Sequence, residues 1–256
     1  MRTIDEVRQR GLDNIAGIVT RPGMYAAAGR EMEFACRDAL GDLAFIDERD
    51  TEHEAARERL HFYGKRGVVG AFDAVFGTAS NHVAEVASVF AEIFHSFDYL
   101  EIGPKRDQSE WEEMCSGLVG AHAMTDTRRS AVLERYGKPT LVVDTRVLCY
   151  VSDALPARWI FFDCWEPRGE VYQEGKGGIL SQPHADPLLR DIRVPSTRFD
   201  SSLVLTLWGK LQRWGPTWRF DHPEADDENG YPPDVREALR AIQASDPSQS
   251  LGPRRP

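Results

Sequence analysis

The pattern of apolar residues changes once along the chain, at Pro139, and this change restricts the fold more than any other feature. Before it, apolar side chains recur every three or four residues, which is the period of an amphipathic helix. After it come three short segments rich in β-branched and aromatic residues, 140–144, 146–152 and 158–165, separated by turn residues. Such segments are typical of an antiparallel meander. The sequence therefore predicts an α+β protein, with a helical N-terminal half followed by a small antiparallel sheet with packed helices.

Local signals mark where the expected helices begin and end. Thr3 and Glu6 form a capping box at the start of the first helix, which Pro22 and Gly23 end. Ser80 is expected to cap a later helix, and Gly137 to end the last one of this half. Ser109 and Glu112 form a second capping box. Further helices are expected over residues 31–46, 66–77 and 127–136. The buried stripe of the second helix should be Met32, Ala35, Ala39, Leu43 and Ile46.

We divide the chain into a mainly helical region, 1–137, and a β-rich region with helices, 138–244, which we expect to share one core. Residues 245–256 are expected to be a disordered tail. Within the second region, 171–173 suits a further strand and 174–200 an irregular segment. The expected core positions of the sheet are Val142, Val147, Cys149, Ile160 and Phe162. The closing helices are expected from Asp200 or Ser201 to Trp214, where the run SLVLTLW would also suit a strand, and over 233–244.

Composition limits the kind of partner. The net charge of −10 disfavours nucleic acid, because a nucleic-acid binder needs a basic footprint, and it favours a basic protein partner. No apolar run is long enough to span a membrane, and the charged N-terminus lacks the apolar core of a signal peptide. The four cysteines are Cys36, Cys115, Cys149 and Cys164, and none of them is part of a CxxC pair. They are expected to be reduced thiols or, alternatively, to form two disulfides. We therefore expect a cytoplasmic protein that does not contact membranes.

The pentapeptide Arg21-Pro22-Gly23-Met24-Tyr25 lies between two expected helices. It resembles a segment of gyrase-type ATPases, in which the following helix carries a Glu and an Asn that handle water and magnesium. Residues 34–47 contain no Asn, and no D-x-G-x-G motif follows, so the sequence does not support ATP binding. The alternative is a helix stop in which Met24 and Tyr25 pack back on the helix. Over about the first 100 residues the pattern also resembles small uncharacterised bacterial proteins, some linked to toxin immunity, which implies no catalytic residues.

Two segments gather possible metal ligands. His184-x-Asp186 is one, and the acidic run 221–230 is the other. An EF-hand with Gly230 at loop position six would place Arg236 at position twelve, which fails. Residues 175–178 superficially resemble a phosphate-binding loop, but no Ser or Thr follows the lysine. We expect no metal and no cofactor.

Nucleophilic catalysis would have to use a cysteine and a histidine that meet in space. The first candidate set is Cys164 with His184 and Asp163, and the second pair is Cys149 with His122. Both cysteines fall within expected strands, where a small buried hydrophobic side chain is the ordinary interpretation.

The sequence thus leaves two hypotheses. The favoured one is a non-enzymatic acidic protein-binding protein, most concretely a bacterial immunity or antitoxin protein that occludes a basic partner. Its partner-binding residues would come from the acidic loop and the aromatic-rich second half: Asp226, Asp227, Glu228, Trp165 and Trp218. The alternative is an enzyme of unfamiliar type that uses Cys164, His184 and Asp163.

Overall fold

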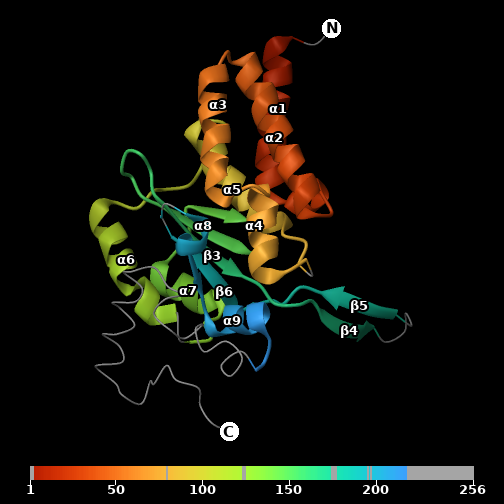
Figure 1. Cartoon of the computed structure of the whole chain (residues 1–256), viewed down its shortest axis with the longest axis vertical. Coiled ribbons are helices and arrows are strands. Elements are labelled where there is room, and N and C mark those ends of the chain that lie inside the picture. The colour runs from red at the N-terminus through yellow and green to blue at the C-terminus, as the bar shows by residue number, and fades with distance from the viewer. Residues whose placement is uncertain are drawn as a thin grey trace. The chain divides into compact units, whose positions relative to one another are not determined.

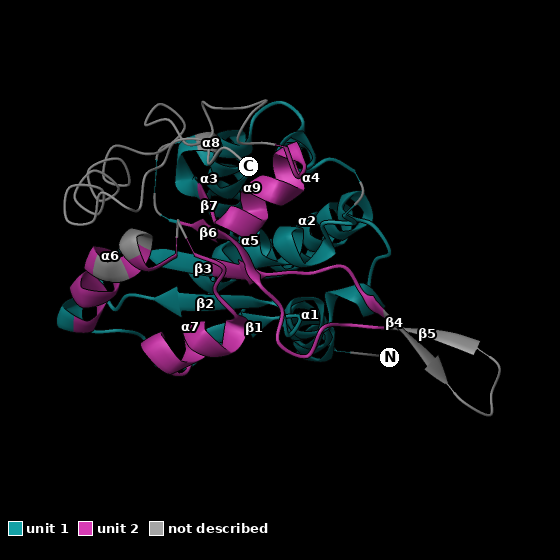
Figure 2. Ribbon diagram, turned by 90° about the horizontal axis from the view of Figure 1, so that it is seen from below, with its two compact units in different colours: residues 1–109, 139–161, 194–203 teal, residues 110–138, 162–193, 204–256 magenta. Residues whose placement is uncertain are grey.

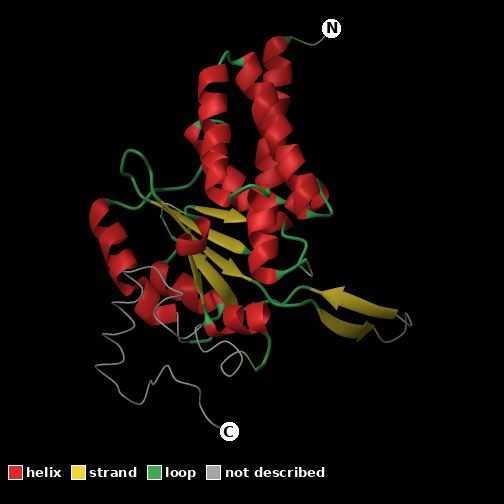
Figure 3. Cartoon of the chain, in the orientation of Figure 1, coloured by secondary structure: helices red, strands yellow, loops and turns green. Residues whose placement is uncertain are grey.

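The computed structural model describes residues 3–78, 80–122, 125–173, 178–194, 196 and 198–217. It is α+β, as the sequence predicts, with helices filling the N-terminal half (Figures 1 and 3). The helices of the N-terminal half are α1 (Ile4–Thr20), η1 (Pro22–Met24), α2 (Gly29–Ile46), α3 (Asp50–Arg59), η2 (Leu60–Tyr63), α4 (Gly67–Phe76), α5 (Val83–Ser96), α6 (Gln108–His122) and α7 (Arg129–Tyr136). The later elements are β1 (Leu141–Val143), β2 (Val147–Val151), β3 (Trp159–Cys164), β4 (Gly169–Gln173), β5 (Gly178–Gln182), β6 (Leu189–Arg193), α8 (Phe199–Ser202), β7 (Leu203–Leu205) and α9 (Leu207–Trp214).

The main sheet is antiparallel, with strand order β1-β2-β3-β6-β7, and β4 and β5 form a separate hairpin. In the first pair Leu141 lies opposite Cys149. The expected meander is confirmed as β1-β2-β3, and so is a strand at 171–173, which is part of β4. Every residue of β3 is buried, including Ile160 and Phe162, because both faces of this strand are apolar. Val142, expected in the core, is only half-buried.

The first helix begins and ends as its sequence predicts. Thr3 Oγ1 accepts a hydrogen bond from the Glu6 backbone N–H at 3.2 Å, and Glu6 Oε2 accepts one from the Thr3 N–H at 2.9 Å. After Thr20 the helix stops, and buried Pro22 begins η1. Tyr25 packs back on the helix, since its hydroxyl occupies the space that a Cβ on Gly17 would need. Met24 is exposed, so only one of the two residues expected to pack back does so.

Two expected helix caps are wrong. The residue before α5 is His82, in the left-handed conformation with φ 51°, and not Ser80. His82 takes this position because its buried ring is held between Glu85 and the Gly77 carbonyl. Helix α6 already begins at Gln108, which places Ser109 inside its first turn.

The expectation of an irregular segment at 174–200 is wrong, because β5 and β6, an inner strand of the main sheet, both lie within it. The sequence LRDIR of β6 carries three charges, which hid a strand whose five residues are all buried. The following segment is also divided: Leu203–Leu205 forms β7, and Thr206 caps α9 by accepting a hydrogen bond from the Gly209 N–H at 3.1 Å. The expected helix 233–244 and the tail 245–256 lie outside the described residues.

The chain forms two compact units, coloured separately in Figure 2. Unit 1 comprises residues 1–109, 139–161 and 194–203, and unit 2 comprises 110–138, 162–193 and 204–256. Each unit therefore takes segments from both regions expected from the sequence. In the core of unit 1, α2 packs on α1 and α5, and in unit 2 Phe162 packs on Tyr136 and His122.

Two expectations from composition can be compared with the structure. All four cysteines are reduced, as the absence of paired spacing suggests. Among the described helices, none has an apolar stretch of the length that a bilayer crossing requires.

Candidate functional site

The alternative catalytic set lies at the end of β3. Asp163 and Cys164 are consecutive buried residues of this strand, so their side chains leave it on opposite faces. The Asp163 carboxylate accepts a hydrogen bond from Arg190 at 2.5 Å. His184 is 47% exposed, and its Nδ1 lies 3.7 Å from Glu166 Oε2. The contacts described for Asp163 and His184 thus involve different partners, Arg190 and Glu166.

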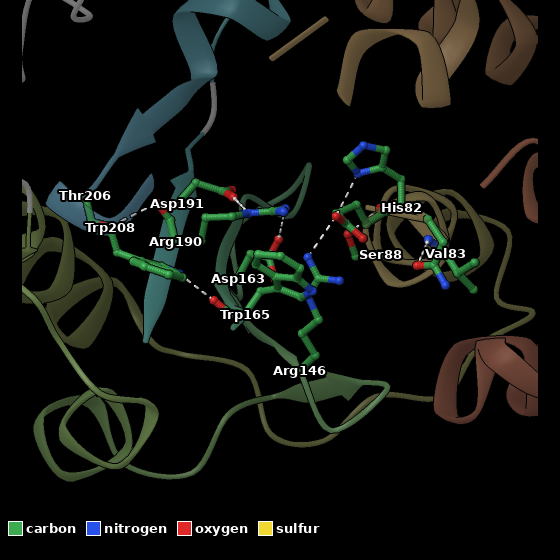
Figure 4. Close-up of polar contacts among 12 residues, drawn as sticks. His82, Val83, Ser88, Arg146, Asp163, Trp165, Arg190, Asp191, Thr206 and Trp208 are labelled. Atoms are coloured by element: carbon green, nitrogen blue, oxygen red, sulfur yellow. Dashed lines mark hydrogen bonds and ion pairs between the residues drawn. The ribbon is translucent and has the colours of Figure 1, made fainter. Parts of the chain in front are cut away.

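The partner of Asp163 belongs to a buried charged network on β6 (Figure 4). Arg190 donates to Asp163 and, at 3.1 Å through Nε, to Asp191. Burial, together with the neighbouring Asp163 carboxylate, raises the pKa of Asp191 to about 7. Removal of the guanidinium would leave two buried carboxylates without their cation, which is strongly destabilising.

Trp165 is half-buried and takes part in the same region of unit 2. The Arg190 guanidinium carbon lies 5.5 Å from the centre of the Trp165 ring. The backbone carbonyl of Trp165 accepts a hydrogen bond from Trp208 Nε1 at 2.6 Å (Figure 4). These contacts hold Trp165 within unit 2, and its predicted part in partner binding stays a prediction. The other predicted partner-binding residues lie outside the described residues: Asp226, Asp227, Glu228 and Trp218.

Of His184 and Asp186, considered above as metal ligands, Asp186 binds the start of α7. Asp186 accepts hydrogen bonds from the Ser130 N–H at 2.8 Å and the Ser130 hydroxyl at 2.6 Å. Burial opposes ionisation, but these hydrogen bonds outweigh it and lower the pKa of Asp186. Glu166, beside His184, is also bound by Arg128 at 2.6 Å. No group of three or more His, Cys, Asp or Glu side chains that could hold a metal occurs in the part of the chain that the structure describes.

The second cysteine–histidine pair has similarly closed surroundings. Burial and the charge of Arg135 lower the pKa of His122 to about 4, so its imidazole is neutral at pH 7. Its ring nitrogens lie 3.1 Å from the Thr127 and Tyr136 hydroxyls. Cys149 is buried in β2, with its sulfur 3.8 Å from the Val147 carbonyl.

Unit 1 contains a buried polar cluster that the sequence did not indicate (Figure 4). His82 Nδ1 lies 2.9 Å from Glu85 Oε1, and Arg146 donates to the same oxygen at 2.8 Å. All three side chains are largely buried. Because Glu85 binds groups from both sides, the cluster fastens the start of α5 to the turn between β1 and β2.

The outer surface of the N-terminal helices carries exposed apolar side chains, in contrast to the buried polar side chains of this cluster. Of the seven large hydrophobic residues that are exposed in the described chain, six lie between residues 4 and 45: Ile4, Val7, Met24, Tyr25, Phe34 and Phe45. Over residues 3–59 the sequence has thirteen acidic and eight basic residues, a net charge of −5. This part of unit 1 thus combines exposed apolar groups with excess negative charge.

The outward face of α2 holds the most regular part of this surface. Phe34, Asp38, Asp42 and Phe45 follow one another at steps of four, four and three residues, so they share one side of the helix over about 16 Å. Phe34 is 55% exposed and Phe45 76% exposed, and both aspartates are exposed. Neither aspartate has an ion-pair or hydrogen-bond partner within the described ranges. We call these four residues the acidic–aromatic stripe.

The stripe was detectable in the sequence. The buried stripe predicted for this helix is correct at Met32 and Leu43, which are buried, whereas Ala35, Ala39 and Ile46 are half-buried. Phe34 and Phe45 fall outside it, eleven residues apart, which is close to three helical turns. Two aromatic residues off the buried face of one helix are the signal that was missed.

No family model, curated protein or solved structure is significantly similar to this chain. The functional argument therefore depends on geometry and charge.

Proposed function

We propose that the protein binds a basic partner protein, without catalysis, through the acidic–aromatic stripe of α2, and that immunity or antitoxin activity is its most concrete form. The observation that carries the proposal is the stripe itself: two exposed phenylalanines flank two aspartates on one helix face, and the described residues offer these aspartates no partner. Exposed apolar patches with a polar rim are typical of interaction sites.

The residues of the stripe define the chemistry of the partner. Asp38 and Asp42 would pair with Lys or Arg, while Phe34 and Phe45 offer ring faces to apolar side chains or guanidinium groups. Arg30 already lies over the Phe34 ring, 5.8 Å from its centre, so this ring accepts a cation. The fitting partner is a surface on which Arg or Lys alternates with apolar residues.

Charge also distinguishes this partner from other occupants. A second copy related by a twofold axis would bring the same acidic patch against itself, and like charges in contact are unfavourable. The C-terminal run 221–228 is itself acidic, so the same repulsion disfavours it as a cover for the stripe. A basic surface is complementary to the stripe and would be steered towards it.

Association kinetics test the proposal. The partner is first captured from the native host and purified, and its association rate is then measured by stopped flow at several salt concentrations. Asp38→Asn with Asp42→Asn should lower the rate at low salt about fivefold and flatten its salt dependence. The matched control is Glu101→Gln with Asp153→Asn, which removes the same charge from exposed positions of unit 1 outside the N-terminal helices and should leave the rate within about twofold.

Two results would contradict the proposal. One is an association rate that does not depend on salt or that falls equally in both double variants. The other is loss of biological activity in Cys164→Ala or His184→Ala while partner binding and folding stability stay unchanged, which would favour the enzyme hypothesis.

A further inference from the structure

A charged groove lies on unit 1 where α3, η2 and the start of α4 meet α2. Its volume is about 450 Å³, within the range of small-molecule sites. The cations of its lining are Arg37, Arg57 and Lys65, joined by the imidazole of His61, and its carboxylates are Glu54 and Glu58. Cations from separate elements thus converge on one concave surface.

The local charge opposes that of the whole chain. The groove is lined by three cations and two carboxylates, a net charge of +1, although the chain carries a net charge of −10. Within the described residues, the side chains of His61 and Lys65 have no hydrogen-bond or ion-pair partner. Their polar groups are therefore available to a ligand.

Buried Glu33 holds the back of the groove in place. One oxygen binds Arg37 at 2.6 Å, and the other accepts a hydrogen bond from the Val69 N–H at the start of α4 at 3.1 Å. A Cβ at Gly67, whose φ is +72°, would lie 2.6 Å from Glu33, so only glycine allows this close approach. Arg37 is consequently oriented before any ligand binds.

Glu54 likewise orients a cation, since it pairs with Arg57 at 2.8 Å. Glu58 has no such partner within the described residues and offers an acceptor to a hydroxyl group. The lining thus combines several cationic donors with one acceptor that has no partner among the described residues.

We propose that this groove binds a small hydroxylated phosphate monoester. A phosphate dianion can accept from Arg37, Arg57 and Lys65 together, because it offers three charged oxygens, whereas a carboxylate offers two. Glu58 would accept a hydrogen bond from a hydroxyl of the organic part. The groove is separate from the acidic–aromatic stripe, and the proposal is independent of the proposed partner.

Chemical-shift titrations with inorganic phosphate and glycerol 3-phosphate test this site, with acetate as the comparison anion. Both phosphates should bind saturably at the groove, glycerol 3-phosphate more tightly, and acetate at least about tenfold more weakly. Arg57→Gln and Lys65→Gln should each weaken phosphate binding about fivefold or more.

Arg59→Gln is the matched control. Arg59 lies on the same helix as Arg57 but bonds to Ser96 and does not line the groove, so its loss should change affinity less than about twofold. Equal losses in Arg57→Gln and Arg59→Gln would show attraction by net charge alone and overturn the site. Shifts that do not saturate, or that map away from both Arg37 and residues 54–67, would also overturn it.

Discussion

The outer face of α2 and strand β6 both carry charged residues, but they use them in opposite ways. On β6, Arg190 and Asp191 are buried, and Arg190 is bound to two carboxylates. On α2, Asp38 and Asp42 are exposed, and the described structure gives them no partner. The two regions contain charged residues alike, and they differ in whether those residues are buried and paired.

The difference indicates what each region can do. Buried, paired charges have exchanged water for one another, so their loss is felt in folding stability. Exposed, unpaired charges contribute little to stability but act at a distance on other molecules. We therefore assign stability to the β6 network and recognition to the acidic–aromatic stripe, and the predictions below test that division.

The largest effect is expected at Arg190. Arg190→Met leaves Asp163 and Asp191 buried without their cation and should lower the free energy of unfolding by about 3–5 kcal/mol at pH 8, measured by urea denaturation. The loss should shrink towards pH 6, because the pKa of Asp191 is already raised to about 7 and protonation removes one buried charge.

Arg128 provides the control for burial. It binds Glu166 at 2.6 Å, close to the distance of the Arg190–Asp163 pair, but its side chain is half-exposed. Arg128→Met should therefore cost about 1 kcal/mol or less. Equal losses at the two arginines would break the distinction between the regions.

A buried phenylalanine of β3 and an exposed one of α2 give the next comparison. Phe162 is buried in β3, and Phe162→Ala should cost about 3–5 kcal/mol, as large-to-small core changes do. Phe45→Ala should change stability by less than about 0.5 kcal/mol, because its ring is exposed. If Phe45→Ala were as costly as a core change, Phe45 would be a packing residue and not part of a recognition surface.

A smaller effect concerns acid sensitivity in unit 2. Burial lowers the pKa of His122 to about 4 in the folded protein, whereas an unfolded histidine titrates near 6.5. The folded state thus binds fewer protons than the unfolded state between these values, and stability falls as pH falls through them. Between pH 7.5 and 5 this group should cost roughly 2 kcal/mol.

His122→Gln isolates that contribution, since glutamine can still bond to the Thr127 and Tyr136 hydroxyls but does not titrate. Denaturation midpoints of the variant should depend less on pH than those of the wild type over this range. Identical pH profiles would mean that His122 is not the buried neutral group described above.

Helix periodicity and capping predicted much of unit 1 because its signals are local. The capping box at Thr3 and the helix stop at Pro22 depend on residues a few positions apart. Strand β6 could not be predicted in the same way, since the buried charges of LRDIR are balanced by Asp163, far away in sequence. His82 at the start of α5 likewise depends on the buried cluster with Glu85 and Arg146.

The candidate site shows the same limit. Cys164, His184 and Asp163 were chosen for residue type, and type does not reveal that Asp163 serves Arg190 or that His184 lies beside Glu166. The stripe on α2 could have been predicted from the sequence, because helical spacing alone places Phe34 and Phe45 off the buried face. Only the structure shows that the side chains of the stripe are exposed.

Site-specific photo-crosslinking tests the central claim most directly. A photoreactive phenylalanine analogue is placed at position 34, at position 45 or, as the control, at Leu155, which is 94% exposed on a loop of unit 1. In the native host, positions 34 and 45 should capture the same basic protein, and position 155 should not. Capture of a second copy of this chain at 34 and 45, or equal capture at all three positions, would contradict the account.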